Sequence, residues 1–176
     1  QSKIDNILLI SGALSPNSSS IKSILNSLDG IEVIHQYRFD NIQWNENPND
    51  ALSQNPKMIL FDDFPTGNID RSLFDKLVKS SRSQQIPIVY LEGPNSNLTT
   101  GDIIRSQFPF FIPTAIEPNV FTSLSDDISN RIYSGINLSS FPPQTRTVKW
   151  TMENNDWVNF TDGSFLIASK NDVYMA

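Results

Sequence analysis

The sequence predicts an α/β fold: a three-layer, doubly wound, mostly parallel sheet with a β-rich antiparallel C-terminal extension. Three observations predict it. Short apolar or alternating segments, each ended by polar residues or glycine, have the composition of strands in a helix-covered sheet. Segments with helical periodicity lie between them, as parallel connections require. The chain then becomes β-rich beyond Pro142. Its 176 residues are enough for one domain with its own core, so residues 1–176 are predicted to form a single domain.

The first strand is predicted at Asn6–Ile10, a short apolar run. Ser18–Leu28 follows, with four apolar residues at helical spacing, and either Ser18 or Ser19 is placed to cap this predicted helix. Ile31–Tyr37 alternates between apolar and polar residues, which predicts the second strand.

Two further strands and one helix continue the same pattern. The polar stretch Trp44–Pro56 is predicted to be a surface connection. Lys57–Phe61 is an apolar run typical of a third buried strand, and Pro87–Leu91 is a fourth. Between them, Ile69–Ser80 has helical periodicity. The predicted order up to this point is β-α-β-β-α-β.

The last third of the chain is different. A short helix is expected within Gly101–Phe111. The dipeptides Asn154-Asn155 and Asp162-Gly163 are turn signals between β-type segments, which indicates antiparallel pairing. These segments are Thr145–Met152, Trp157–Thr161, Phe165–Ser169 and Asp172–Ala176.

Composition excludes several classes of function. A net charge of −6 without any basic run argues against nucleic-acid binding and against binding to anionic lipid. The absence of cysteine removes disulfides, thiolate metal sites and cysteine nucleophiles. A single histidine excludes a histidine-rich zinc site. No apolar run is longer than that at Ile7–Ile10, which is far too short to cross a membrane. Because a predicted strand stands near each end, we expect the chain to be a piece of a longer protein.

Candidate sites are expected where the predicted parallel strands end, because ligands of doubly wound sheets bind at that edge. The four strand ends are Ser11-Gly12, the loop after Tyr37, Asp62-Asp63 and Glu92-Gly93.

The first strand end leads into a loop rich in hydroxyl groups, Ser11–Ser20. Backbone N–H groups and serines before a helix can bind a phosphate, and the loop loosely resembles those of flavodoxins and FMN reductases. It has one glycine and no glycine-rich spacing, so we favour the alternative of a helix-capping loop.

The acidic pair Asp62-Asp63 has oxygen ligands of the kind that Mg²⁺ takes, but adjacent strand residues point to opposite faces. A solvated strand end or a helix cap is the favoured interpretation, and no metal site is predicted. His35 lies inside the second predicted strand, and any serine–histidine mechanism would need it. Nothing else in the sequence points to it, so a structural role is favoured and no catalytic residue is predicted.

The fourth strand and its loop carry a family likeness. Pro87–Gly93 resembles the nucleophile elbow of class I glutamine amidotransferases, P-x-x-G-x-C-x-G, with Glu92 in the cysteine position. The family also needs a later histidine, and this chain has none after His35. Since a carboxylate cannot replace a thiolate in forming the glutamyl thioester, the resemblance implies a glutamine amidotransferase-like, flavodoxin-like fold without the family's chemistry.

A closer likeness is to the amidotransferase-like domains of bacterial envelope proteins that carry BatA or von Willebrand factor A regions. The matching segments follow the same order: Ile7–Gly12, Ile31–Val33, Leu60–Asp63, Glu92–Ser96 and Phe110–Pro113. The later Phe141–Pro143 and the strand at Gly163–Ala168 match too. The resemblance implies a non-catalytic, periplasmic domain with protein partners in a membrane complex. It implies that any membrane helices lie outside this chain.

Three hypotheses of function follow. The first is a non-enzymatic recognition or scaffolding module without a cofactor, with exposed aromatic candidates at Trp44, Phe64 and Phe108–Phe111; the last group could equally be core. The second is a domain that binds FMN or a nucleotide between the Ser11–Ser20 and Glu92–Ser96 loops. The third is a hydrolase that works through Asp62, Glu92 or Ser96. The candidate binding residues are Ser11, Gly12, Asp62, Asp63, Glu92, Gly93, Asn95 and Ser96.

Overall fold

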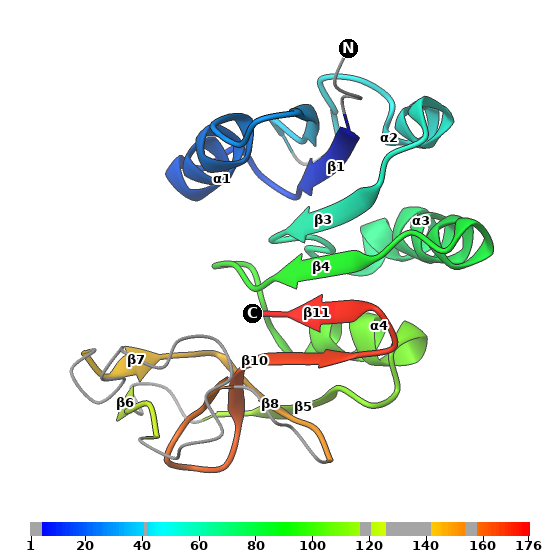
Figure 1. Cartoon of the computed structure of the whole chain (residues 1–176). Coiled ribbons are helices and arrows are strands. Elements are labelled where there is room, and N and C mark those ends of the chain that lie inside the picture. Colours follow the sequence, from blue (N-terminus) through cyan, green and yellow to red (C-terminus); the bar gives the residue numbers. More distant parts are fainter. Residues whose placement is uncertain (1–4, 41, 117–120, 126–141, 154–157) are drawn as a thin grey trace. The chain divides into compact units, whose positions relative to one another are not determined.

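A computed structural model describes residues 5–40, 42–116, 121–125, 142–153 and 158–176 of the chain (Figure 1). The chain forms two compact units, unit 1 (Gln1–Asn95) and unit 2 (Ser96–Ala176). The single domain expected over residues 1–176 stays a prediction.

Unit 1 contains a parallel sheet of four strands. They are β1 (Asp5–Ser11), β2 (Ile31–Tyr37), β3 (Met58–Asp62) and β4 (Ile88–Leu91). Their order is β2-β1-β3-β4, and each neighbouring pair is parallel. The chain moves from β1 to β2 on one side and then to β3 on the other, so the order reverses between β1 and β3. The four predicted strands and their parallel pairing are confirmed.

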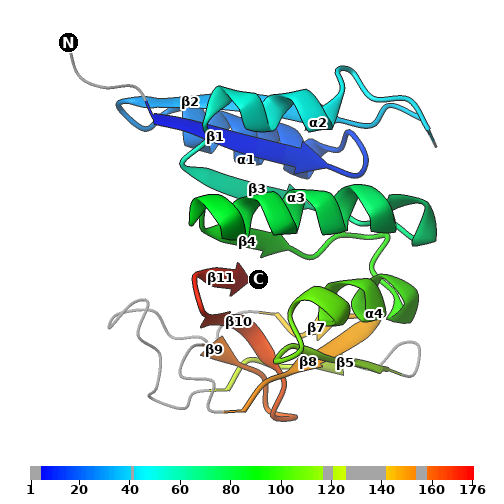
Figure 2. The ribbon, with the colours of Figure 1, turned by 90° about the vertical axis from the view of Figure 1, so that its right-hand side faces the viewer.

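Helices cover both faces of this sheet, which gives three layers (Figure 2). Helix α1 (Pro16–Asn26) lies on one face, and α2 (Pro48–Ala51) and α3 (Arg71–Gln84) lie on the other. Short 3-10 turns at Leu52–Gln54 and Asn68–Asp70 complete the connections.

Two local predictions in unit 1 are wrong. The segment Trp44–Pro56 is more than a surface connection, because it contains α2, and its Ala51 and Leu52 are buried. The cap of α1 is Ser15 rather than Ser18 or Ser19, and Pro16 occupies the first helical position. Proline suits that position because its missing N–H has no intrahelical partner there.

The core of unit 1 includes an aromatic cluster. Phe61, Phe64 and Phe74 are each 0% exposed, and their ring centroids lie 5.1 to 6.2 Å apart. The expectation that Phe64 is an exposed aromatic is therefore wrong. Trp44 is half-buried and packs edge-on against Phe64 at 5.6 Å, so it also contributes to this cluster.

The described residues of unit 2 form one helix and short antiparallel strands. Helix α4 runs over Leu98–Gln107, capped by Asn97. The antiparallel pairs are β5 with β8, β6 with β7, β9 with β10 and β10 with β11. These strands are β5 (Ile112–Ala115), β6 (Phe121–Thr122), β7 (Gln144–Thr145), β8 (Val148–Thr151), β9 (Val158–Asn159), β10 (Phe165–Lys170) and β11 (Val173–Met175). The predicted antiparallel, β-rich character of the C-terminal part is confirmed, whereas the turn signal Asn154-Asn155 lies outside the described residues.

Phe108–Phe111 were predicted to be either exposed aromatic residues or part of the core, and the structure of unit 2 distinguishes the two. Phe108 and Phe111 are 1% and 0% exposed, and Phe111 contacts Phe165 with a centroid distance of 5.6 Å. Phe110 is half-buried. Phe108 and Phe111 are therefore core residues. Over the described ranges of the chain, no helix is long and apolar enough to cross a membrane.

Candidate functional site

Three polar side chains from neighbouring strands meet in unit 1. Ser11 ends β1, His35 lies in β2, and Asp62 ends β3. The Ser11 hydroxyl donates to Asp62 Oδ2 at 2.9 Å and lies 3.0 Å from His35 Nε2. The β-register explains the arrangement: Ser11 pairs with Asp62, and His35 pairs with Leu9, two residues before Ser11 on the same face.

This arrangement differs from a serine–histidine catalytic pair. A serine has one hydroxyl proton, and here it is donated to Asp62, so His35 Nε2 must donate to the serine oxygen. A catalytic histidine does the reverse, because it accepts the proton of its serine. Ser11 is also 0% exposed. His35 therefore has a specific polar partner that sequence reasoning missed, but the geometry is that of a buried structural hydrogen-bond chain.

The protonation state of His35 fits this role. Burial lowers the pKa of His35, the positive charge of Lys22 lowers it further, and Asp62 offsets part of the effect. The neutral imidazole is favoured, and it keeps one N–H for Ser11.

A second acidic group, Asp63, shapes the loop after β4. Its carboxylate accepts the backbone N–H of Asn95 at 3.0 Å and the Asn95 side-chain amide at 2.6 Å. Burial raises the pKa of Asp63, and the negative charge of Asp62 adds to this, while the hydrogen bonds from Asn95 oppose it. The backbone of Asp63 has φ of 50°, in the left-handed region that aspartate and asparagine tolerate best among non-glycine residues.

Two glycines let the loops approach Asp63 closely. A Cβ on Gly93 would lie 2.3 Å from the side chain of Asp63, and one on Gly12 would lie 2.0 Å from its carbonyl oxygen. Any side chain at either position would displace the loop. The glycines of the two predicted strand ends therefore serve backbone packing.

A buried ion pair lies beside these loops. Arg38, directly after β2, pairs with Asp70, which precedes α3, and the two are 7% and 2% exposed. Asp70 also accepts from the backbone N–H and the hydroxyl of Thr66, both at 2.8 Å. The guanidinium donates to the Thr66 hydroxyl at 3.2 Å and lies over the ring of Trp44 at 4.9 Å.

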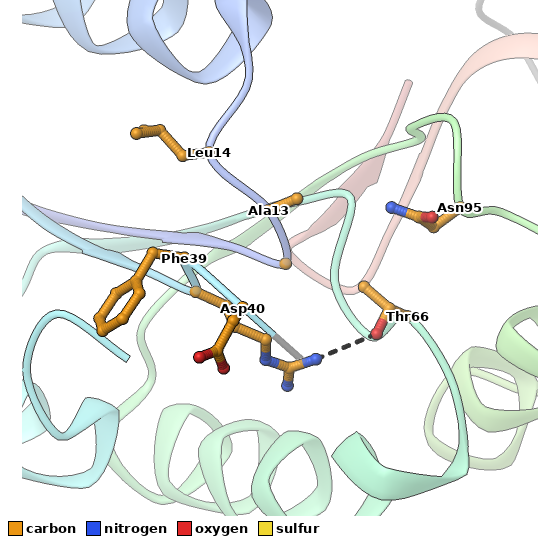
Figure 3. A pocket seen from close by; sticks show the side chains of 8 residues that line it. Ala13, Leu14, Phe39, Asp40, Thr66 and Asn95 are labelled. Carbon is orange, nitrogen blue, oxygen red and sulfur yellow. Dashed lines mark hydrogen bonds between the residues drawn. The ribbon is translucent and has the colours of Figure 1, made fainter. Parts of the chain in front are cut away.

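These loops line a pocket of about 560 Å³ at the carboxyl ends of the strands (Figure 3). The order of the strands reverses there, which is where doubly wound sheets bind ligands. Its walls come from the loops that follow all four strands of unit 1. The lining residues are Gly12, Ala13, Leu14, Arg38, Phe39, Asp40, Thr66 and Asn95.

Several serines of the hydroxyl-rich loop Ser11–Ser20 form hydrogen bonds within this segment itself. Ser15 and Ser18 form a reciprocal capping box, in which each side chain accepts the backbone N–H of the other residue. Ser19 and Ser20 donate to the carbonyl groups four residues earlier in the chain. The favoured interpretation of a helix-capping loop agrees with these contacts.

The predicted binding residues fall into different environments. Gly12 and Asn95 line the pocket, whereas Ser11 and Asp62 are buried and bound to each other. Asp63 accepts a hydrogen bond from the side chain of Asn95, which lines the pocket. Glu92 and Gly93 are half-buried, and Ser96 is a buried residue of unit 2. No group of three or more metal-ligating side chains occurs in the described part of the chain.

Sequence reasoning missed the residues that give the pocket its chemistry. These are Arg38, Phe39, Asp40 and Thr66, whereas the lining residue Leu14 lies within the Ser11–Ser20 loop that is a predicted candidate site. The signal for Arg38, Phe39 and Asp40 is the predicted strand end after Tyr37, since these three residues follow it directly.

Comparisons with known proteins add evidence on the fold. No family model matches the chain, and no curated protein matches its sequence. Its structure is similar to a crystal structure assigned to one component of a GMP synthase from Thermoplasma acidophilum, with a TM-score of 0.50 and 11% identity. The match covers 100% of this chain and 84% of that one. At this identity the likeness shows the fold alone, and it confirms the predicted α/β, amidotransferase-like fold class.

Proposed function

We propose that the chain is a non-catalytic module with an amidotransferase-like fold that acts in protein recognition or scaffolding. The observation that carries the proposal is the direction of the hydrogen bond from Ser11. This hydroxyl is buried and gives its proton to Asp62, in the opposite sense to an activated nucleophile. The sequence offers no cysteine and no second histidine as replacements.

The elbow after β4 supports the same conclusion. Glu92 stands where the resembling enzymes carry their cysteine, and a carboxylate cannot form the thioester of glutamine transfer. The neighbouring Gly93 is in close contact with Asp63, so this loop is packed around a structural acid.

The cellular setting that we propose is the bacterial envelope, with the domain on the periplasmic side and protein partners in a membrane complex. It rests on the resemblance of the strand segments to envelope amidotransferase-like domains. The net charge of −6 supports a protein partner over nucleic acid. Affinity capture from the native membranes should recover a specific partner, and capture of nothing above background would count against it.

Enzyme assays test the absence of catalysis directly. We expect no glutamate release from glutamine and no esterase turnover above the rate of a boiled sample. Turnover that disappears in Glu92→Gln or Ser11→Ala would overturn the proposal and would favour a hydrolase. Loss of turnover must occur in variants that unfold at the same urea concentration as the wild type.

A second candidate function is small-molecule binding, and the pocket at the strand ends favours it. FMN and nucleotides are the ligands to examine first. A thermal shift with either one, or yellow colour in the purified protein, would support this function. No shift across the panel would remove it.

A further inference from the structure

Two exposed apolar side chains line the strand-end pocket. Leu14 and Phe39 line it and are 55% and 57% exposed (Figure 3). Ile42, in the turn after Asp40, is 69% exposed. Large apolar side chains gathered at a pocket mark a binding surface more often than single ones spread over a protein.

Asp40, which also lines the pocket, provides a fixed negative charge next to Phe39. Its Oδ1 accepts the backbone N–H groups of Ile42 at 2.9 Å and Gln43 at 2.7 Å. These two bonds hold the exposed carboxylate in one orientation. Its Oδ2 makes no hydrogen bond to the described residues and can receive a donor from a ligand.

The charge balance of the pocket favours a cation. The positive charge of Arg38 is matched by Asp70 inside the protein. Asp40 is therefore the lining group whose charge is not neutralised by a partner among the described residues. An anion would instead be repelled by the negative charge of Asp40. The hydroxyl groups of Ser19 and Ser20 in the neighbouring loop already donate to backbone carbonyl groups, so they are not available to bind it.

We propose that this pocket binds a basic, partly apolar segment of a partner protein. A lysine or arginine side chain lies against Asp40 Oδ2 and the ring of Phe39, which supplies an electron-rich face to a cation. Apolar side chains flanking that residue in the partner rest on Leu14 and Phe39. The inference rests on the proposed recognition function and specifies the chemical character of the partner segment.

The test uses the whole chain and synthetic tripeptides, N-acetyl-Leu-Lys-Leu-amide and its Glu counterpart, followed by ¹⁵N NMR. We expect the lysine peptide to shift the backbone amides of Leu14, Phe39 and Asn95, with a Kd on the order of 1 mM. The glutamate peptide should leave them unchanged. Raising the salt concentration should weaken the binding, since the charges are near the surface.

Asp40→Asn is the decisive variant because an asparagine oxygen can still accept from Ile42 and Gln43. It removes only the charge, and we expect about three- to fivefold weaker binding. Asp29→Asn is the matched control, since it changes the net charge equally at an exposed position outside the pocket. It should bind like the wild type.

Several outcomes would overturn the inference: no shifts with the lysine peptide, equal binding of the glutamate peptide, or equal affinities of wild type and Asp40→Asn. Binding of free cadaverine as tight as that of the peptide would identify the pocket as a small-amine site and reject the protein partner. The hydrolase assays are independent, so a negative peptide result leaves the non-catalytic function standing.

Discussion

The side chains of Arg38 and Asp70 are almost completely buried, and each is the principal charge partner of the other. Removing one member of such a pair leaves an uncompensated charge in a poorly solvated place, which costs far more than the pair itself contributes. Thr66 adds two donors to Asp70, so the pair joins the end of β2 to the loop before α3. Its role in this structure is to hold the pocket wall in place.

Asp70→Asn should therefore destabilise the protein by about 3–5 kcal/mol, because it leaves Arg38 charged without its partner. Arg38→Met combined with Asp70→Asn should recover part of this loss, since both charges are then gone. Urea unfolding of the two single variants and the double variant measures the coupling free energy. Strictly additive losses would show that the two charges do not depend on each other.

At the scale of single elements, α1 depends on its N-terminal cap. The Ser15 hydroxyl accepts the backbone N–H of Ser18 at 3.1 Å, and Ser18 returns a bond to the backbone N–H of Ser15 at 3.2 Å. The helix has few other sources of stability, because Ile24 is 64% exposed and Ile21 and Leu25 are only half-buried. None of its apolar side chains is fully buried.

Ser15→Ala should cost about 1 kcal/mol, the usual value for losing a serine cap. Ser23→Ala, at an exposed position in the same helix, is the matched control. It should be neutral or slightly stabilising, since alanine has the higher helix propensity. The free energy of unfolding in urea measures both, and equal effects would mean that the capping box contributes nothing.

Helix α4 depends on the close approach of Gly101 to the strands of unit 2. A Cβ there would lie 2.7 Å from Pro113 Cβ, in β5, and 3.5 Å from Trp150, in β8. An alanine would favour the helix but would force the helix and the strand apart. We expect Gly101→Ala to lose about 1–3 kcal/mol, as overpacked core positions do.

Gly67→Ala is the control for this prediction. No atom lies within 4 Å of its would-be Cβ, and its φ of 169° is extended backbone that any residue adopts. It should be neutral or stabilising by up to about 1 kcal/mol, because alanine restricts the unfolded chain. A Gly101→Ala protein as stable as Gly67→Ala would show that β5 can move away at no cost.

At the scale of the whole molecule, the sequence was sufficient to predict strands whose buried residues follow one another along the chain. The runs at Asn6–Ile10 and Lys57–Phe61 are apolar throughout because both faces of a parallel strand are covered, and they became β1 and β3. Phe64 could not be placed in this way. It lies in a polar loop, and its burial depends on Phe74, which only the folded chain brings near.

The candidate site was also predictable only in part: its location could be predicted, but the contacts of its side chains could not. The rule for parallel sheets located the edge, and Gly12 and Asn95 do line the pocket there. The partners of each side chain were not predictable. The distance from Ser11 to His35 depends on the register of β1 against β2, and the neutralisation of Arg38 depends on a residue 32 positions later in the chain.

The pH dependence of stability gives a test that involves the whole fold, because His35 is the chain's one histidine. Burial lowers the pKa of His35 below its usual value of about 6.5, so between these two pKa values the unfolded chain binds more protons than the folded one. The stability from neutral His35 is complete above about pH 6.5 and is lost as the pH falls toward the folded pKa.

We therefore expect the free energy of unfolding to decrease between pH 7.5 and pH 5.5 by an amount that is smaller in His35→Gln. Glutamine can still donate to Ser11 but does not titrate. Asp63, whose pKa burial raises, contributes the opposite slope, with stability decreasing as the pH rises from its unfolded value through its folded value. Because both proteins keep Asp63, the difference between their pH profiles isolates His35. Parallel profiles, or an imidazole that titrates by NMR above pH 6.5, would show that burial does not hold the imidazole neutral.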